Sequence, residues 1–179
     1  ADEQITRFEY DAQNNLRAVV DAEGGRSTSN FDRVYNQTAA TDANGHTTTY
    51  GFDALNRRIS MTDALGQTSS MGYDPVGNVL TSTDALGRIT TTSYDADNRA
   101  ISMTAADGTV TRYAYDAVDN RIAMTRAHGL AEAQTTTYAY DRNNRLLSQT
   151  DALGHANTFE YDANGNAVAQ TDALGHRTS

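Results

Sequence analysis

The stretch TDALGRITTTSYDADNRAISM, residues 83–103, holds every feature that decides the fold of this 179-residue chain. Asp-Ala-Leu-Gly at residues 84–87 is followed by a threonine-rich run, and Tyr94 then leads into a second tetrapeptide, residues 95–98. Asp accepts hydrogen bonds from the backbone just ahead of it, and Gly or Asn at the fourth position tolerates a positive φ. Each tetrapeptide therefore predicts a turn, and the stretches of about six residues between turns have the usual length of a strand.

The same pattern returns along the whole chain. An aromatic residue followed by Asp occurs eight times, spaced by 21 residues except for one step of 25, and a Gly follows each aromatic after 14 residues. Such a fixed period is the signature of a repeat protein. The repeat-defining residues are the pairs Tyr10 and Asp11, Phe31 and Asp32, Phe52 and Asp53, Tyr73 and Asp74, Tyr94 and Asp95, Tyr115 and Asp116, Tyr140 and Asp141, Tyr161 and Asp162, with the glycines Gly24, Gly45, Gly66, Gly87, Gly108, Gly129, Gly154 and Gly175.

Three positions depart from the pattern. Tyr35 stands where the other aromatic–Asp turns have Asn, Asp or Gly, so we expect the turn at Asp32 to be distorted. In the Asp-Ala-x-Gly turns, of which residues 84–87 are an example, Ala105 and Arg126 replace Asp in two repeats. The four extra residues of the 25-residue step lie within residues 130–134, after the turn that ends at Gly129. We expect residues 1–179 to form one repeat array with this insertion.

The segments between turns have strand character. Threonine-rich runs favour extended backbone, and side chains alternate with period two, as in Tyr113 with Tyr115 and Ile122 with Met124. The predicted fold is therefore all-β: about eight 21-residue β-hairpin repeats, sixteen short strands, forming a long coiled antiparallel sheet. One face would be apolar, with ring stacked over ring and Met over Ile between neighbouring repeats.

Composition argues against a globular core. Leu, Val, Ile and Phe together make up 27 residues, about 15% of the chain, and the net charge is −9. Such values are typical of disordered segments. A thin repeat sheet needs no globular core, so the low count indicates a thin-walled architecture in this chain.

Other counts exclude whole classes of function. The absence of Cys excludes disulfides, thiolate zinc sites and cysteine nucleophiles. No apolar run is long enough to span a bilayer, and residues 1–7 are too polar for a signal peptide, so we expect no membrane insertion. The basic residues are scattered arginines in an acidic background, which argues against a nucleic-acid partner.

Residues 83–95 and 150–166 resemble the YD repeat, also called the RHS repeat, and the resemblance extends over essentially the whole chain. It is found in bacterial Rhs polymorphic toxins, in the B and C components of insecticidal toxin complexes and in teneurins. The resemblance implies a β-sheet that spirals into a hollow shell, which in the bacterial members encloses a C-terminal toxin domain.

The resemblance also implies a function and a setting. We expect a non-catalytic structural segment of a larger bacterial protein, secreted or at the cell surface, whose partners are the rest of the Rhs-type chain and its enclosed toxin or effector domain. The alternative is an adhesin-like module that binds carbohydrate or a protein receptor through a face rich in Tyr, Thr and Arg. The tyrosine rings could stack on sugars, or could face inward as a substitute for a core.

Simple turn formation explains most of the residues that could otherwise carry chemistry. Stacked Asp residues could bind calcium, but each Asp is expected to cap its own turn. His46, His155 and His176 follow turn glycines and suit surface turn positions better than a metal site. Asp74-Pro75-Val76-Gly77 matches the start of the family's self-cleavage motif but lies in register with the other turns. We assign no catalytic, cofactor-binding or metal residue, and expect unpaired edge strands to favour edge-to-edge self-association.

Overall fold

The computed structural model describes residues 5–128 and 132–179. Within these residues all regular structure is β, in seventeen strands that pair antiparallel, so the predicted fold class is confirmed. The count exceeds the expected sixteen because a short strand, β17 (Arg177–Thr178), follows the last turn. Gly129, Leu130 and Ala131 lie outside the described residues.

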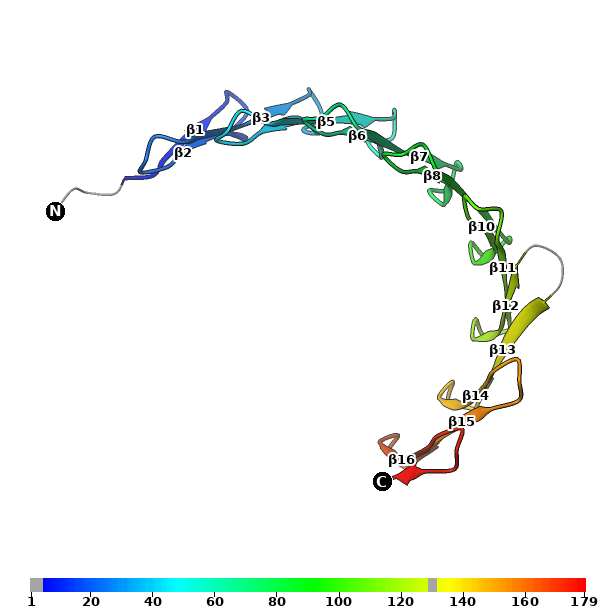
Figure 1. The fold of residues 1–179 in the computed structure, drawn as a ribbon. Coiled ribbons are helices and arrows are strands. Elements are labelled where there is room, and N and C mark those ends of the chain that lie inside the picture. Colours follow the sequence, from blue (N-terminus) through cyan, green and yellow to red (C-terminus); the bar gives the residue numbers. More distant parts are fainter. Residues whose placement is uncertain (1–4, 129–131) are drawn as a thin grey trace. The chain divides into compact units, whose positions relative to one another are not determined.

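Two compact units divide the chain, Ala1–Ile89 and Thr90–Ser179, and in each the strands lie side by side in chain order (Figure 1). The first unit contains β1 (Arg7–Tyr10), β2 (Leu16–Val20), β3 (Arg26–Phe31), β4 (Gln37–Thr41), β5 (Thr47–Phe52), β6 (Arg58–Thr62), β7 (Thr68–Tyr73) and β8 (Val79–Thr83). The second contains all but the first residue of β9 (Ile89–Tyr94), then β10 (Ala100–Thr104), β11 (Val110–Tyr115), β12 (Arg121–His128), β13 (Glu132–Tyr140), β14 (Leu146–Thr150), β15 (Ala156–Tyr161), β16 (Ala167–Thr171) and β17.

The tight turns share one backbone geometry. At Asp95, the first-position N–H donates to the carbonyl of Arg99 (3.0 Å), and the fourth-position N–H of Asn98 donates back to the carbonyl of Asp95 (3.1 Å). Asn98 has a φ of 62°, in the left-handed region. This is the three-residue hairpin loop in which a type I turn is followed by a left-handed residue. The predicted turns are thus confirmed at all eight aromatic–Asp positions.

The turn at Asp32 is not distorted, so that expectation was wrong. Tyr35 takes a φ of 69°, and its N–H still donates to the carbonyl of Asp32, at 3.3 Å. The Asp32 N–H donates to the carbonyl of Asn36 at 2.9 Å, as in the other turns. Tyr35 therefore keeps an energetically unfavourable positive φ, and the turn keeps the same conformation as the others.

The two turns without Asp behave differently. At Ala105 the turn forms with the usual backbone bonds, and the Asp107 carboxylate accepts the N–H of Thr109 (2.8 Å) in place of the missing side chain. At Arg126 the expected turn is absent: Arg126 pairs with Gln134, and His128 with Glu132. Residues 126–128 therefore continue β12 and residues 132–134 belong to β13, whereas Leu130 and Ala131 of the insertion lie outside the described residues.

A β-bulge accompanies each aromatic–Asp turn. Gly51 pairs with Ser60 but Phe52 pairs with Arg58, which leaves Ile59 as the additional residue of β6. The same register shift occurs in the hairpins of the seven other aromatic–Asp turns. Because a bulge re-aims side chains, the first residue of the second strand lies opposite the aromatic residue that precedes the turn.

Neighbouring repeats are staggered. Ser93 pairs with Ser102 and Ser102 with Arg112, so aligned residues lie 19 apart although the repeat is 21 residues long. A stagger of two keeps equivalent side chains on the same face. It also means that identical rings are not directly opposite one another, contrary to expectation. The direct cross-strand partner of a ring is Met in two pairs, Tyr50 with Met61 and Tyr113 with Met124, and a different residue type elsewhere, as in Phe159 with Gln170.

The described residues contain almost no core. Only Ala18, Ala169 and Thr111 are buried, with exposures of 2%, 6% and 6%, and no large side chain is fully buried. Rings and aliphatic side chains of the strands are half-buried or exposed. The fold is therefore held by ladder hydrogen bonds, cross-strand pairs and the turns, as expected for a repeat array.

Candidate functional site

The aromatic–Asp turns form the most highly connected polar feature of the molecule. In each turn one carboxylate oxygen of Asp accepts two backbone N–H groups. Asp95 Oδ1, for example, accepts those of Asp97 (3.0 Å) and Arg99 (2.9 Å). The same pair of bonds occurs at Asp11, Asp32, Asp53, Asp74, Asp116, Asp141 and Asp162. Each of these carboxylates therefore binds N–H groups of its own turn.

Hydrogen bonding lowers the pKa of these eight Asp carboxyls. For Asp95 the main cause is the backbone N–H of Arg99, followed by the Arg99 side chain, and desolvation opposes both. For Asp116 the largest cause is the side chain of Asn120. The pKa is also lowered at Asp11, Asp32, Asp53, Asp74, Asp141 and Asp162. All eight groups are consequently held as carboxylates, the form that accepts hydrogen bonds.

The second carboxylate oxygen binds the side chain of the residue after the left-handed position, which we call the fifth turn residue. This residue is Asn or Arg. Arg occupies it at Arg57, Arg99 and Arg145, whose Nε atoms donate to their own Asp at 2.7, 2.8 and 2.6 Å. Asn occupies it at Asn15, Asn36, Asn78, Asn120 and Asn166, each donating from Nδ2 at 2.8–2.9 Å.

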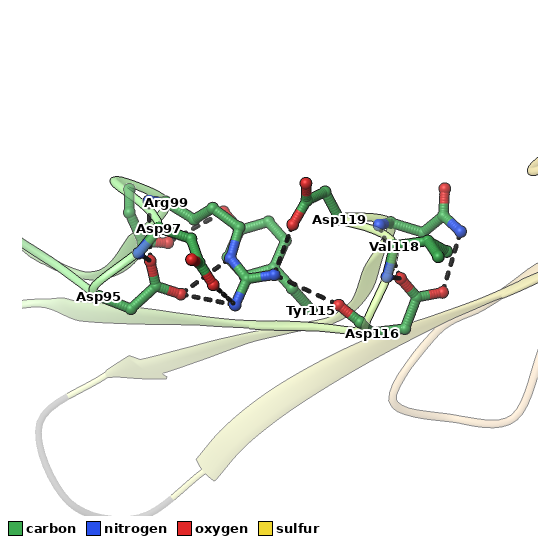
Figure 2. Close-up of polar contacts among 9 residues, drawn as sticks. Asp95, Asp97, Arg99, Tyr115, Asp116, Val118 and Asp119 are labelled. Carbon is green, nitrogen blue, oxygen red and sulfur yellow. Dashed lines mark hydrogen bonds and ion pairs between the residues drawn. The ribbon is translucent and has the colours of Figure 1, made fainter.

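Arg99 also reaches the following repeat (Figure 2). Its Nη1 donates to the carbonyl of Asp116 (3.2 Å) and to Asp119 Oδ1 (2.6 Å), and its guanidinium carbon lies 5.0 Å from the centre of the Tyr115 ring. The Tyr115 hydroxyl in turn donates to the carbonyl of Ala100 (2.9 Å). Charged hydrogen bonds, a cation–π contact and a tyrosine hydroxyl thus join two turns that lie 21 residues apart.

We call this set of contacts an arginine clamp: the Arg side chain binds its own Asp, the backbone carbonyl of the next Asp, and the ring of the next Tyr. Two other arginines form the same clamp. Arg57 lies 4.6 Å from the Tyr73 ring and donates to the carbonyl of Asp74 at 2.6 Å. Arg145 lies 4.8 Å from the Tyr161 ring and donates to the carbonyl of Asp162 at 3.2 Å. Their side chains are only 24% and 27% exposed. Sequence reasoning missed these residues, although Arg alternating with Asn directly after the left-handed position was a visible signal.

The Asp-Ala-x-Gly turns present different side chains. Asp42, Asp151 and Asp172 pair with the Nδ1 atoms of His46, His155 and His176 at 3.0, 3.1 and 2.9 Å. The third residue of several of these turns is a leucine that is largely exposed: Leu65 (82%), Leu86 (74%), Leu153 (82%) and Leu174 (81%). The predicted histidine positions are therefore surface turn positions, each paired to one carboxylate of its own turn.

The aromatic face has open grooves but no enclosed pocket among those seen in the described residues. In the first unit, a groove of about 350 Å³ is lined by Gln37, Tyr50, Phe52 and Arg58, with the Arg58 guanidinium 5.9 Å from the Tyr50 ring. In the second unit, Arg121 lies 5.9 Å from the Tyr113 ring and 4.9 Å from the Tyr138 ring. These rings are accessible, which leaves room for a stacking ligand.

Over residues 5–128 and 132–179, His, Asp and Glu side chains nowhere gather in threes in a way that could hold a metal ion. The same part of the chain contains no helix with the length and apolar character that crossing a membrane requires.

Comparison with known proteins adds a family. The model of the RHS repeat matches residues 36–68, 73–109 and 94–131, which together cover just over half of the chain. No curated protein matches the sequence.

Solved structures also resemble the chain. One is the Photorhabdus luminescens Tc holotoxin pore carrying a TccC3 mutation, at 13% identity and a TM-score of 0.44, over 94% of this chain and 15% of that one. A second is a TcdB2–TccC3–Cdc42 crystal structure, at 13% identity and a TM-score of 0.38, and a third is TcdB2–TccC3 without its hypervariable C-terminal region, at 14% and 0.39. Each of the latter two matches over 94% of this chain and 14% of its own, so this chain spans about one seventh of their length.

Proposed function

The chain belongs to the RHS repeat family, and we propose that it is a segment of wall in a β-sheet shell that encloses or scaffolds a toxin or effector domain of the same larger protein. In this proposal residues 1–179 act as one array without catalytic residues of their own. The parent protein is bacterial and is secreted or displayed at the cell surface.

The observation that carries the proposal is the combination of a long strand meander with almost no core. With three buried residues in the described part, the sheet leaves both faces accessible, as a wall between two compartments requires. A globular binding domain would instead bury one face. The Asp turns and arginine clamps supply cohesion along the edge, where a wall that lacks a core needs it.

The test uses the full parent protein. The coding sequence on both sides of these residues should add further repeats and a C-terminal domain. That domain should resist limited proteolysis in the intact protein and be cut rapidly when expressed alone. A C-terminal domain that is cut equally fast in both forms would refute enclosure.

A matched pair of variants makes the proteolysis test specific. Arg57→Ala, Arg99→Ala and Arg145→Ala together remove three clamps and should expose the enclosed domain to protease. Arg33→Ala, Arg112→Ala and Arg142→Ala remove the same charge from side chains that make no ion pair in the described residues, and should preserve protection.

The groove at Tyr50, Phe52 and Arg58 favours one second candidate, the adhesin-like module that binds carbohydrate or a protein receptor. Sugars stack on accessible aromatic rings. A glycan array distinguishes the candidates: micromolar binding that is lost in Tyr50→Ala, with the fold retained by circular dichroism, would support the adhesin. Absence of binding together with protease protection would support the wall.

A further inference from the structure

Adjacent aromatic–Asp turns meet through two variable positions. One is the fifth turn residue of the first repeat, and the other is the fourth, left-handed residue of the next repeat. Where the fifth residue is Arg, the fourth residue of the next turn is Gly or Asp: Arg57 with Gly77, Arg99 with Asp119, and Arg145 with Gly165. Where it is Asn, Asn follows at Asn36 with Asn56 and at Asn120 with Asn144.

At the Arg junctions the guanidinium binds the backbone carbonyl of the next Asp and, at one junction, a carboxylate as well. Guanidinium carries five donors and no acceptor, and it must cross to the next turn to reach the carbonyl of Asp. Gly77 and Gly165 have no side chain to accept a bond, so Arg57 and Arg145 bind only the backbone carbonyl of the next turn; a Cβ on Gly165 would be in ordinary van der Waals contact with Arg145 Nη1 at 3.6 Å. Asp119 instead accepts from Arg99 at 2.6 Å.

The Asn junctions need an acceptor on a side chain. Asn36 Nδ2 donates to Asp32 Oδ2 (2.9 Å) and to Asn56 Oδ1 (2.9 Å). Asn120 Nδ2 does the same with Asp116 (2.9 Å) and Asn144 (3.0 Å). Asn is too short to reach the next carbonyl as Arg does, so the side-chain amide across the junction satisfies its second donor.

We propose that these two positions form a pairing code that decides which repeats are compatible as neighbours, with Arg requiring Gly or Asp and Asn requiring Asn. A mismatched pair leaves a side-chain donor without an acceptor, or replaces a charged hydrogen bond by a weaker neutral one. From Asn36 onward the residues at these positions alternate between the two kinds of matched junction. It goes beyond the wall proposed above and does not depend on what the wall encloses.

One junction is a natural mismatch. Asn15 is followed by Tyr35, which has no side-chain amide, and within the described residues Asn15 Nδ2 donates only to Asp11. The code therefore identifies the junction between the turns at Asp11 and Asp32 as a weak one.

The test is a double-mutant cycle on the full chain. Arg99→Asn and Asp119→Asn are made singly and together, and exchange of the Val118 and Asp119 backbone N–H groups, both bonded to Asp116, is followed by NMR. Each single variant should accelerate exchange by about tenfold, and the double variant should return to within about threefold of the parent, because contacting residues couple this strongly.

The reverse substitution, which converts an Asn junction into an Arg junction, tests whether the effect depends on the pairing and is not only structural. Asn120→Arg with Asn144→Asp should convert an Asn junction into an Arg junction, with the double variant again more protected than either single one. Arg142→Asn, at a side chain without a bond in the described residues, is the control for lost charge and should change exchange less than twofold. Double variants that exchange as fast as the two single effects combined would overturn the code.

Discussion

The guanidinium of Arg99 lies 5.0 Å from the ring of Tyr115, a residue of the next repeat, while the Tyr115 hydroxyl donates to the carbonyl of Ala100, directly after Arg99. Each of the two side chains therefore reaches across the junction in the opposite direction. Arg57 with Tyr73 and Arg145 with Tyr161 repeat the stacking contact. These reciprocal contacts link neighbouring turns along one edge of a sheet that has almost no core.

Arg99→Lys should weaken this connection although the charge is kept. Lysine cannot bind Asp95, the Asp116 carbonyl and the Tyr115 face together, because it lacks the planar fork of donors. We expect a fall of a few degrees in the melting temperature measured by circular dichroism. Arg142→Lys is the control and should leave it unchanged. Equal melting temperatures for both variants would show that the clamp contributes nothing.

Tyr35→Asn should stabilise the protein. Tyr35 holds a φ of 69°, a conformation that costs a bulky residue about 1–2 kcal/mol and that Asn adopts easily. The new amide would also give Asn15 a matching partner. Urea unfolding should show a gain of about 1 kcal/mol or more in the free energy of unfolding, and Tyr35→Gly, which relieves φ without supplying an amide, should gain less. A loss of stability in both variants would contradict the assignment of strain to Tyr35.

Stability should depend on the aspartate turns in acid. Folding lowers the pKa of the eight Asp carboxyls, so the unfolded chain binds more protons between the folded and unfolded pKa values. Their stabilising contribution is fully present above the ordinary Asp pKa of about 3.9 and is lost as the pH falls through the lowered values. Melting temperatures should therefore be level above about pH 5 and fall steadily below about pH 4.

Asp95→Asn supplies the control for this dependence. The variant loses one carboxylate whose pKa is lowered, so its melting temperature should be lower at pH 7 and should fall less steeply in acid. A melting temperature of the parent protein that rises on acidification would contradict the role given to these turns.

The 179-residue chain should associate through its outer strands. β17 pairs with β16 through Thr171 and Arg177, and its other side has no strand partner in the described residues. Exposed strand edges recruit further strands. Light scattering should show a mass that rises with concentration, and Arg177→Pro should reduce it because proline removes the N–H that points away from β16. Leu174→Ser, at an exposed turn, is the control, and a strict monomer at high concentration would contradict the prediction.

Much of the fold follows from residues that act within one hairpin. Asp95 bonds N–H groups two and four residues ahead, and Asn98 supplies the left-handed φ, so the turn is a local property of five residues. The extended conformation of the threonine-rich strands likewise follows from the residue types within each strand. The expectation for Tyr35 failed because the hydrogen bonds of a turn can hold an unfavourable residue in place. The expectation for Arg126 failed because residues 126–128 pair with residues 132–134 where a turn that lacks Asp was expected.

The sequence by itself therefore determined the eight aromatic–Asp turns, the positive φ of their Asn, Asp and Gly residues, and that the chain is an antiparallel repeat array. Tertiary structure decided the stagger of two residues between repeats and the contact of Arg99 with Tyr115 and Asp116. The physical reason is the range of the interactions. A turn closes over five residues whose spacing the sequence states, whereas neighbouring repeats meet through a register that exists only after both hairpins have paired.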